Sequence, residues 1–131
     1  MNAFVGGPGP SRPAPKYVFE DWRQFLRFSD IRAPANIFVF LDEHPDSIND
    51  GWFVYCTTDP NGNGPPEVSE WSDLPASYHD GAGSFAFADG HSEIHKWMDA
   101  RTGTPVTYSI INGLSVRGSV DVGWIQQRTP P

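Results

Sequence analysis

The sequence predicts an α+β fold dominated by β-structure, in which an antiparallel sheet of hairpins carries long loops and one short helix. Three observations support this class. β-branched and aromatic residues gather in short runs, 13 Gly and 13 Pro residues interrupt the chain, and 14% of the residues are aromatic. Because 131 residues suffice for one hydrophobic core but not for two, we expect a single domain over residues 1–131.

Residues 1–16 are rich in Pro and Gly and predict an extended segment. From Phe19 to Ile31 the apolar residues follow helical spacing, with acidic residues in the first turn, so a short amphipathic helix is expected. The runs Asn36–Leu41 and Trp52–Thr57 predict two strands joined by an acidic loop. Many turn-forming residues make the stretch 58–77 a long loop.

The segment Ser84–Trp97 predicts a hairpin, because Asp89-Gly90 suits a two-residue type I′ turn between alternating runs. That turn would pair Phe85 with Ile94. It also places three apolar side chains on the core face: Phe85, Phe87 and Ile94. The opposite face would combine small side chains (Ser84, Ala86 and Ala88) with large polar ones (His91, Glu93 and His95). The small side chains would leave room for another element to lie across this face.

The C-terminal third contains one more hairpin signal. The runs Val106–Ile111 and Leu114–Val116 flank Asn112-Gly113, which favours a tight turn between two strands. Residues 126–131 carry no clear pattern, so we expect an irregular tail.

Charge and composition exclude several classes of partner. Nine basic against sixteen acidic residues give a net charge of −7, which repels nucleic-acid phosphates and anionic lipid surfaces. The longest apolar run is too short to cross a bilayer, and the first residues lack a signal-peptide pattern. Cys56 is the one cysteine, so an internal disulfide and a thiolate zinc cluster are impossible; its apolar surroundings favour a buried thiol over a nucleophile.

The segment Asp59–Glu70 has the spacing of a twelve-residue calcium loop. Oxygen-bearing side chains occupy the ligand positions, and a glycine stands at the sixth. The candidate calcium ligands are Asp59, Asn61, Asn63 and Glu70. The alternative is a polar loop of Asx turns that binds no metal. A helix–loop–helix module is excluded, because the preceding run predicts a strand.

Two further groups could carry chemistry. On a strand, His91, Glu93 and His95 would share one face and could hold a transition metal, although a solvated polar face would look the same. The acidic loop Asp42–Asp46 follows a strand, a position that suits an active site. Its carboxylates could equally cap backbone amides.

His79 stands nine residues before Asp89-Gly90, and this spacing resembles the signature of the prepilin-type processing-associated H-x9-DG family. Three further stretches resemble sequence segments typical of that family, namely Phe38–Gly51, Leu74–His79 and Gly90–Trp97. The resemblance extends over most of the chain up to about Arg101. Several such segments in the same order are a more specific signal than one short motif.

This resemblance implies a bacterial cell-envelope protein similar to the pseudopilins of type II secretion or to type IV pilins. Precursors of this kind begin with a basic leader, a peptidase site and an apolar helix, none of which is in the sequence. We therefore expect a pilin-like head whose N-terminal helix has been cut away. The implied location is the periplasm or cell surface, with inner-membrane anchoring before assembly. The implied partners are further copies or other pilin-like subunits, bound through that helix.

Within this framework the signature residues His79, Asp89 and Gly90 have a structural role, with the Asp89 carboxylate accepting a hydrogen bond from the His79 imidazole. Calcium-stabilised loops in the major pseudopilins also favour a calcium role for Asp59–Glu70 by analogy. The resulting expectation is a structural subunit that is not an enzyme.

Two other classes of function stay open. One is a module that binds a ligand such as a polysaccharide through the loops Asp42–Asp50 and Asp59–Glu70. Its aromatic platforms would be Trp52, Trp71 and Trp97. The other is a metal-dependent hydrolase built from the histidines and acids.

Overall fold

The computed structural model describes residues 2, 5, 25–57, 69–111 and 113–129, with only the backbone described at residues 56, 57 and 69. The described part is α+β and dominated by antiparallel strands, which confirms the predicted class. The strands are β1 (Phe38–Leu41), β2 (Cys56–Thr57), β3 (Ser69–Trp71), β4 (Ala82–Phe87), β5 (Ser92–Lys96) and β6 (Leu114–Ser115). One α-helix, α1 (Val120–Gln126), and two 3₁₀ turns, Phe28–Asp30 and Pro34–Asn36, complete the described elements.

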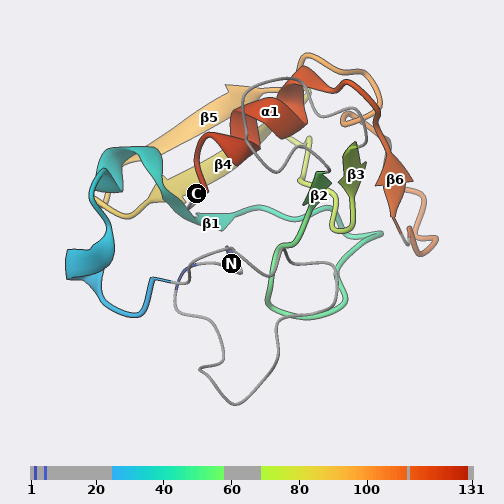
Figure 1. Cartoon of the computed structure of the whole chain (residues 1–131). Helices are drawn as coiled ribbons and strands as arrows, with labels where there is room; N and C mark the ends of the chain where they lie inside the picture. The colour runs from blue at the N-terminus through green and yellow to red at the C-terminus, as the bar shows by residue number, and fades with distance from the viewer. Residues whose placement is uncertain (1, 3–4, 6–24, 58–68, 112, 130–131) are drawn as a thin grey trace.

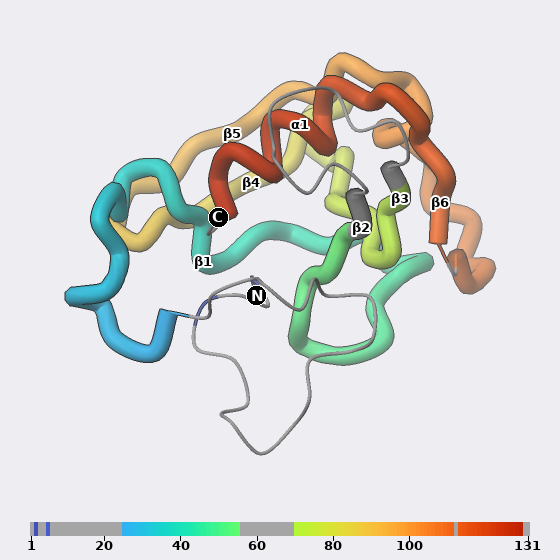
Figure 2. Tube along the Cα trace, viewed as in Figure 1, coloured from blue at the N-terminus to red at the C-terminus, as the bar shows by residue number. Residues whose placement is uncertain are grey.

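The strands form two three-stranded sheets, in the orders β1-β4-β5 and β2-β3-β6 (Figure 1). The buried Asn2 joins the first sheet, because its backbone amide donates to Val39 O at 2.8 Å and its side chain to Phe38 O at 2.8 Å. Figure 2 shows that the residues before β1 and the loop after it leave opposite ends of that strand. No helix among the described residues is long and apolar enough to cross a membrane.

The core between the two sheets is built mainly from aromatic rings. Trp71 is fully buried and packs its ring against Phe53, Tyr55 and Trp97 at centroid distances of 6.1 to 6.3 Å. Phe85 contacts Trp97 at 5.8 Å with an interplanar angle of 72°. Such edge-to-face arrangements add to the free energy gained by burying the rings.

The β4–β5 hairpin forms as predicted, but its register differs by one residue. Phe85 pairs with Glu93, where Ile94 was expected. The Phe87 amide donates to His91 O at 2.9 Å, which leaves a three-residue loop ending in Gly90 at φ +95°. A three-residue loop closed by a left-handed glycine is a common alternative to the two-residue turn, and Asp-Gly suits both.

The shift by one residue reverses the faces of β5, because side chains alternate along a strand. Ile94 is 64% exposed, so its predicted place in the core is wrong. The polar residues share the core face of Phe87 instead, namely His91, Glu93 and His95. The His91 ring stacks on the Phe87 ring at a centroid distance of 4.3 Å and an angle of 6°.

Three other expectations need correction. Of the helix predicted from Phe19 to Ile31, residues 19–24 lie outside the described residues, and the rest contains only the 3₁₀ turn Phe28–Asp30. The strand predicted over Asn36–Leu41 is confirmed from Phe38 on, as β1, because Asn36 ends a 3₁₀ turn. The run Trp52–Thr57 forms a strand only at its last two residues. The hairpin of Val106–Ile111 with Leu114–Val116 is wrong: β6 pairs with β3, and residues 106–111 form no strand.

The expected tail is also different, because helix α1 runs up to Gln126. Val122 and Ile125 are fully buried on one side of this helix. Thr129 is buried as well, and its hydroxyl lies 2.7 Å from the Tyr55 hydroxyl. The C-terminal segment is therefore part of the core.

Candidate functional site

The signature residues lie at the two ends of β4. His79 precedes the strand, and its Nε2 lies 3.6 Å from the Asp42 carboxylate, with both side chains about half exposed. Asp89 follows the strand and accepts hydrogen bonds from the backbone amide and the ring of His91. The contact expected between His79 and Asp89 is therefore wrong, because a six-residue strand of roughly 20 Å separates them.

The Asp89 carboxylate instead fixes the β4–β5 turn. Hydrogen bonds from His91 lower the pKa of Asp89 below its ordinary value. Gly90 supplies the left-handed conformation that the turn needs. Asp89-Gly90 thus acts as a local turn-forming pair. His79 instead contacts Asp42, which follows β1.

The acidic loop after β1 is joined to residues 104–111 through Asp46. The buried Asp46 carboxylate accepts hydrogen bonds from the Thr107 amide at 2.7 Å, the Thr107 hydroxyl at 2.9 Å and the Tyr108 amide at 2.9 Å. Burial alone would raise the pKa of Asp46, but these hydrogen bonds outweigh burial and lower it. Of the two roles predicted for Asp46, amide capping matches these contacts.

His44 strengthens the same junction from inside. Its ring is fully buried, with Nδ1 accepting from the Asp46 amide at 3.2 Å. Nε2 lies 3.0 Å from Thr104 O, and because a carbonyl only accepts, Nε2 carries the hydrogen. Both ring nitrogens are therefore used in folding the loop.

Glu43 and Asp73 form an acidic pair beside this loop. Burial, together with repulsion by Asp73, raises the pKa of Glu43 to about 7. Burial also raises the pKa of Asp73, although its carboxylate accepts hydrogen bonds from the Val54 amide at 2.6 Å and from Asn49 at 3.2 Å. Of these two carboxylates, Glu43 is the one whose pKa lies near neutral pH.

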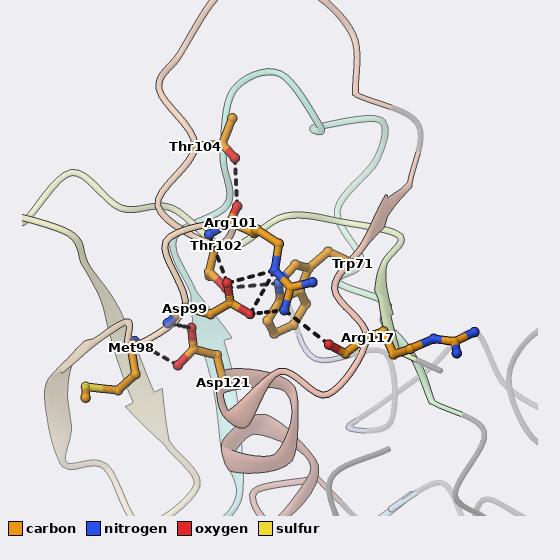
Figure 3. Close-up of polar contacts among 8 residues, drawn as sticks. All are labelled: Trp71, Met98, Asp99, Arg101, Thr102, Thr104, Arg117 and Asp121. Atoms are coloured by element: carbon orange, nitrogen blue, oxygen red, sulfur yellow. Dashed lines mark hydrogen bonds and ion pairs between the residues drawn. The ribbon is translucent and has the colours of Figure 1, made fainter. Parts of the chain in front are cut away.

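A second polar network joins the end of β5 to helix α1 (Figure 3). The buried Asp121 carboxylate accepts from the amides of Met98 at 2.9 Å and Asp99 at 3.0 Å. Asp99 holds the Arg101 guanidinium through three hydrogen bonds, the shortest at 2.6 Å. The Arg101 contact lowers the pKa of Asp99 to about 2. Figure 3 also shows Trp71 donating to the Thr102 hydroxyl at 3.2 Å.

His95 on β5 and His91 just before it both have side-chain partners. His95 stacks on Trp124 at a centroid distance of 3.6 Å, and burial lowers the pKa of His95. His91 bonds to Asp89, as described above. Within the described residues, no group of three or more His, Cys, Asp or Glu side chains is arranged to hold a metal ion.

The aromatic platforms differ from those predicted. Trp71 and Trp97 are buried, so the prediction that they present binding surfaces is wrong. Two tyrosines beside the acidic loop are exposed instead: Tyr78 by 51% and Tyr108 by 91%. Tyr108 has φ +58°, a conformation rare outside glycine. No turn-forming residue pair at this position predicts the left-handed backbone of Tyr108.

The predicted calcium ligands Asp59, Asn61 and Asn63 lie outside the described residues, as does the Cys56 side chain. Glu70 is described, in the middle strand of the second sheet, where its side chain packs against Gly113. The calcium site stays a prediction.

Comparison with known proteins adds no family assignment: no protein-family model, no curated protein and no solved structure matches the chain.

Proposed function

We propose that the chain is the head domain of a pseudopilin-like or type IV pilin-like subunit, a structural protein that assembles with copies or with other pilin-like subunits at the bacterial cell envelope. The outer face of the β1-β4-β5 sheet carries this proposal. Phe40 on β1 and Ile94 on β5 are 56% and 64% exposed there. Between them β4 presents only the small side chains Ser84 and Ala86, which pair with Ile94 and Phe40 respectively.

The width of this face suits a helix. Two strand spacings separate β1 from β5, roughly 10 Å, which is close to the diameter of an α-helix. Apolar side chains at both margins with small ones between them would let a helix lie along β4. Asn2 supports this arrangement, because it is buried against β1 and any preceding segment would start beside the sheet.

The roles of the signature residues also support a structural protein. Asp89 and Gly90 build a turn, and His79 faces Asp42 rather than a nucleophile. In the acidic loop, the side chains of Asp46 and His44 form hydrogen bonds with backbone groups. A subunit of this type would function in the periplasm or at the surface, anchored by its N-terminal helix before assembly.

The test uses the natural protein with the sequence encoded upstream of Met1. We expect an apolar helix there, removal of a leader by a prepilin peptidase, and recovery in an assembled envelope fraction. Ala86→Arg on the outer face should abolish recovery in that fraction, whereas Ser109→Arg in an exposed loop should not. An upstream region without an apolar helix, or normal assembly of the folded Ala86→Arg protein, would refute the proposal.

A ligand-binding module is the second candidate, favoured by one observation. Tyr78 and Tyr108 are exposed beside the acidic residues Asp42 and Glu43, and aromatic rings next to carboxylates suit a polysaccharide. The test is affinity electrophoresis in gels containing polysaccharides, where Tyr108→Ala should lose retardation and Phe28→Ala, at an exposed aromatic residue of the first 3₁₀ turn, should keep it. An unretarded wild-type chain would exclude this candidate for the polymers used.

A further inference from the structure

Strand β5 lies at the rim of its sheet. Within the described part of the chain it pairs with β4 alone, and Figure 1 shows it as the outermost strand of the β1-β4-β5 sheet. An edge strand presents unpaired backbone donors and acceptors to its surroundings.

The hydrogen-bond pattern identifies which residues face outward. The Phe87 amide donates to His91 O at 2.9 Å, and the Trp97 amide donates to Gly81 O at 2.9 Å. In an antiparallel ladder the bonded residues alternate, so the odd-numbered residues of β5 turn their peptide groups towards β4. The even-numbered residues Ser92, Ile94 and Lys96 therefore point their amides and carbonyls to the free edge.

The sequence of β5 is self-complementary in the antiparallel direction. With a two-fold axis at Ile94, the outward peptide groups of Ile94 meet those of its copy, and Ser92 meets Lys96 of the second copy. On the inner face Glu93 then lies opposite His95 of the second copy, a carboxylate facing an imidazole N–H. Axes at Glu93 or His95 would place two ionisable side chains of the same kind directly opposite each other, whereas the axis at Ile94 pairs two apolar side chains. We propose that the chain forms a symmetric dimer by pairing β5 with β5 of a second copy in the register centred on Ile94.

Side-chain burial is compatible with this dimer. All three outward-bonding residues have exposed side chains on the outer face, and the two Ile94 side chains would meet there. Lysine on an edge strand normally discourages pairing. Here the Lys96 ammonium lies 3.3 Å from Asp80 of its own chain and would face a serine across the seam, so repulsion between lysines is avoided. The inference requires the head alone and does not depend on an N-terminal helix.

Disulfide cross-linking tests the register. In a Cys56→Ala background, Ile94→Cys places two thiols at a hydrogen-bonded pair with Cα atoms about 5.5 Å apart, within reach of a disulfide. Ser92→Cys is the matched control, because it lies on the same strand and face but about 13 Å from its own copy in this register. We expect Ile94→Cys to give a covalent dimer on mild oxidation and Ser92→Cys to remain monomeric, while a mixture of Ser92→Cys with Lys96→Cys cross-links.

Sedimentation velocity of the 131-residue chain tests the pairing itself. The wild type should show a concentration-dependent dimer, and Ile94→Pro should lose it. This proline removes an amide that faces away from β4, so the intramolecular ladder keeps its bonds. A wild type that stays monomeric at its solubility limit, or cross-linking of Ser92→Cys as fast as Ile94→Cys, would overturn the inference. Neither result bears on the recovery of the natural protein in the envelope fraction, so the dimer and the proposed function can be refuted independently of each other.

Discussion

The indole of Trp124 lies almost parallel to the imidazole of His95, with the ring planes 14° apart and the centroids 3.6 Å apart. Through this contact, helix α1 covers the inner face of the sheet at the edge strand β5. The Arg128 guanidinium covers the indole 3.9 Å from its centroid, and Phe85 meets its edge at 4.9 Å. A helix of seven residues is too short to be stable alone, so these contacts maintain it.

Trp124→Ala should therefore destabilise the whole domain. Removing a ring that packs on β4 and β5 is expected to lower the free energy of unfolding by about 3 kcal/mol. Val120→Ala is the matched control, because Val120 lies in the same helix with 60% of its surface exposed, and its effect should stay within about 0.5 kcal/mol. Urea denaturation measures both, and equal effects would contradict this role of the indole.

Asp121 anchors the other end of the same helix to the chain after β5. Asp121→Ala removes a buried carboxylate and leaves the amides of Met98 and Asp99 without their acceptor, so we expect a loss of about 2 kcal/mol. Asp80→Asn removes the charge of a surface ion pair with Lys96 and keeps a side chain that tolerates φ +53°, so it should change stability much less than Asp121→Ala. Similar denaturation midpoints for the two variants would show that Asp121 is not a cap.

Gly90 tests the turn part of the signature. A side chain at Gly90 meets no neighbour, so Gly90→Ala isolates the cost of φ +95°, which we expect to be about 1 kcal/mol. Gly51 also has open space and lacks a positive φ, so Gly51→Ala should not be destabilising. Thermal unfolding compares the two, and an equally stable Gly90→Ala protein would reject the turn as the reason for this glycine.

Much of the sheet was predictable because alternating apolar residues and an Asp-Gly turn are local signals. The register was not, because Asp-Gly suits loops of two and of three residues. Tertiary contacts distinguish them: the Ala88 amide donates to Ile37 O at 2.9 Å, and the Phe87 ring stacks on His91. Both contacts require the three-residue loop.

For the polar networks, the sequence indicated the type of interaction but not the residues that it joins. Asp46 was a candidate cap, but the two amides that donate to its carboxylate lie 61 and 62 residues away along the chain. No local spacing rule predicts contacts at that separation. Asp121 was missed altogether, because its helix is short and contains Gly123, which weakens the helical pattern. Burial of Ile125 and stacking of Trp124 decide this segment, and both depend on the finished sheet.

Glu43 should make stability depend on pH. Its pKa rises from an ordinary 4.5 to about 7 on folding, so between these values the folded chain binds more protons than the unfolded chain. Stability from this group therefore falls as the pH rises through that window. Asp99 acts in the opposite sense, because its pKa of about 2 makes its contribution disappear only in stronger acid.

Glu43→Gln removes this titration and should flatten the pH profile of the urea midpoint between pH 4.5 and about 7. Above the window the variant should be more stable than the wild type, since it buries no charge beside Asp73. Asp80→Asn, at an exposed carboxylate that pairs with Lys96 away from this loop, serves as the control and should keep the slope. Parallel profiles for Glu43→Gln and wild type would show that Glu43 does not titrate in this range.

Calcium is the remaining prediction from the sequence. The spacing of Asp59, Asn61, Asn63 and Glu70 predicts that millimolar calcium raises the melting temperature, because a ligand bound only by the folded chain stabilises it by mass action. Differential scanning fluorimetry with calcium, magnesium or a chelator measures the shift. Asp59→Ala should lose the response to calcium, whereas Asp80→Ala should retain it. The same melting temperature with calcium and with chelator would leave this segment as a polar loop of Asx turns.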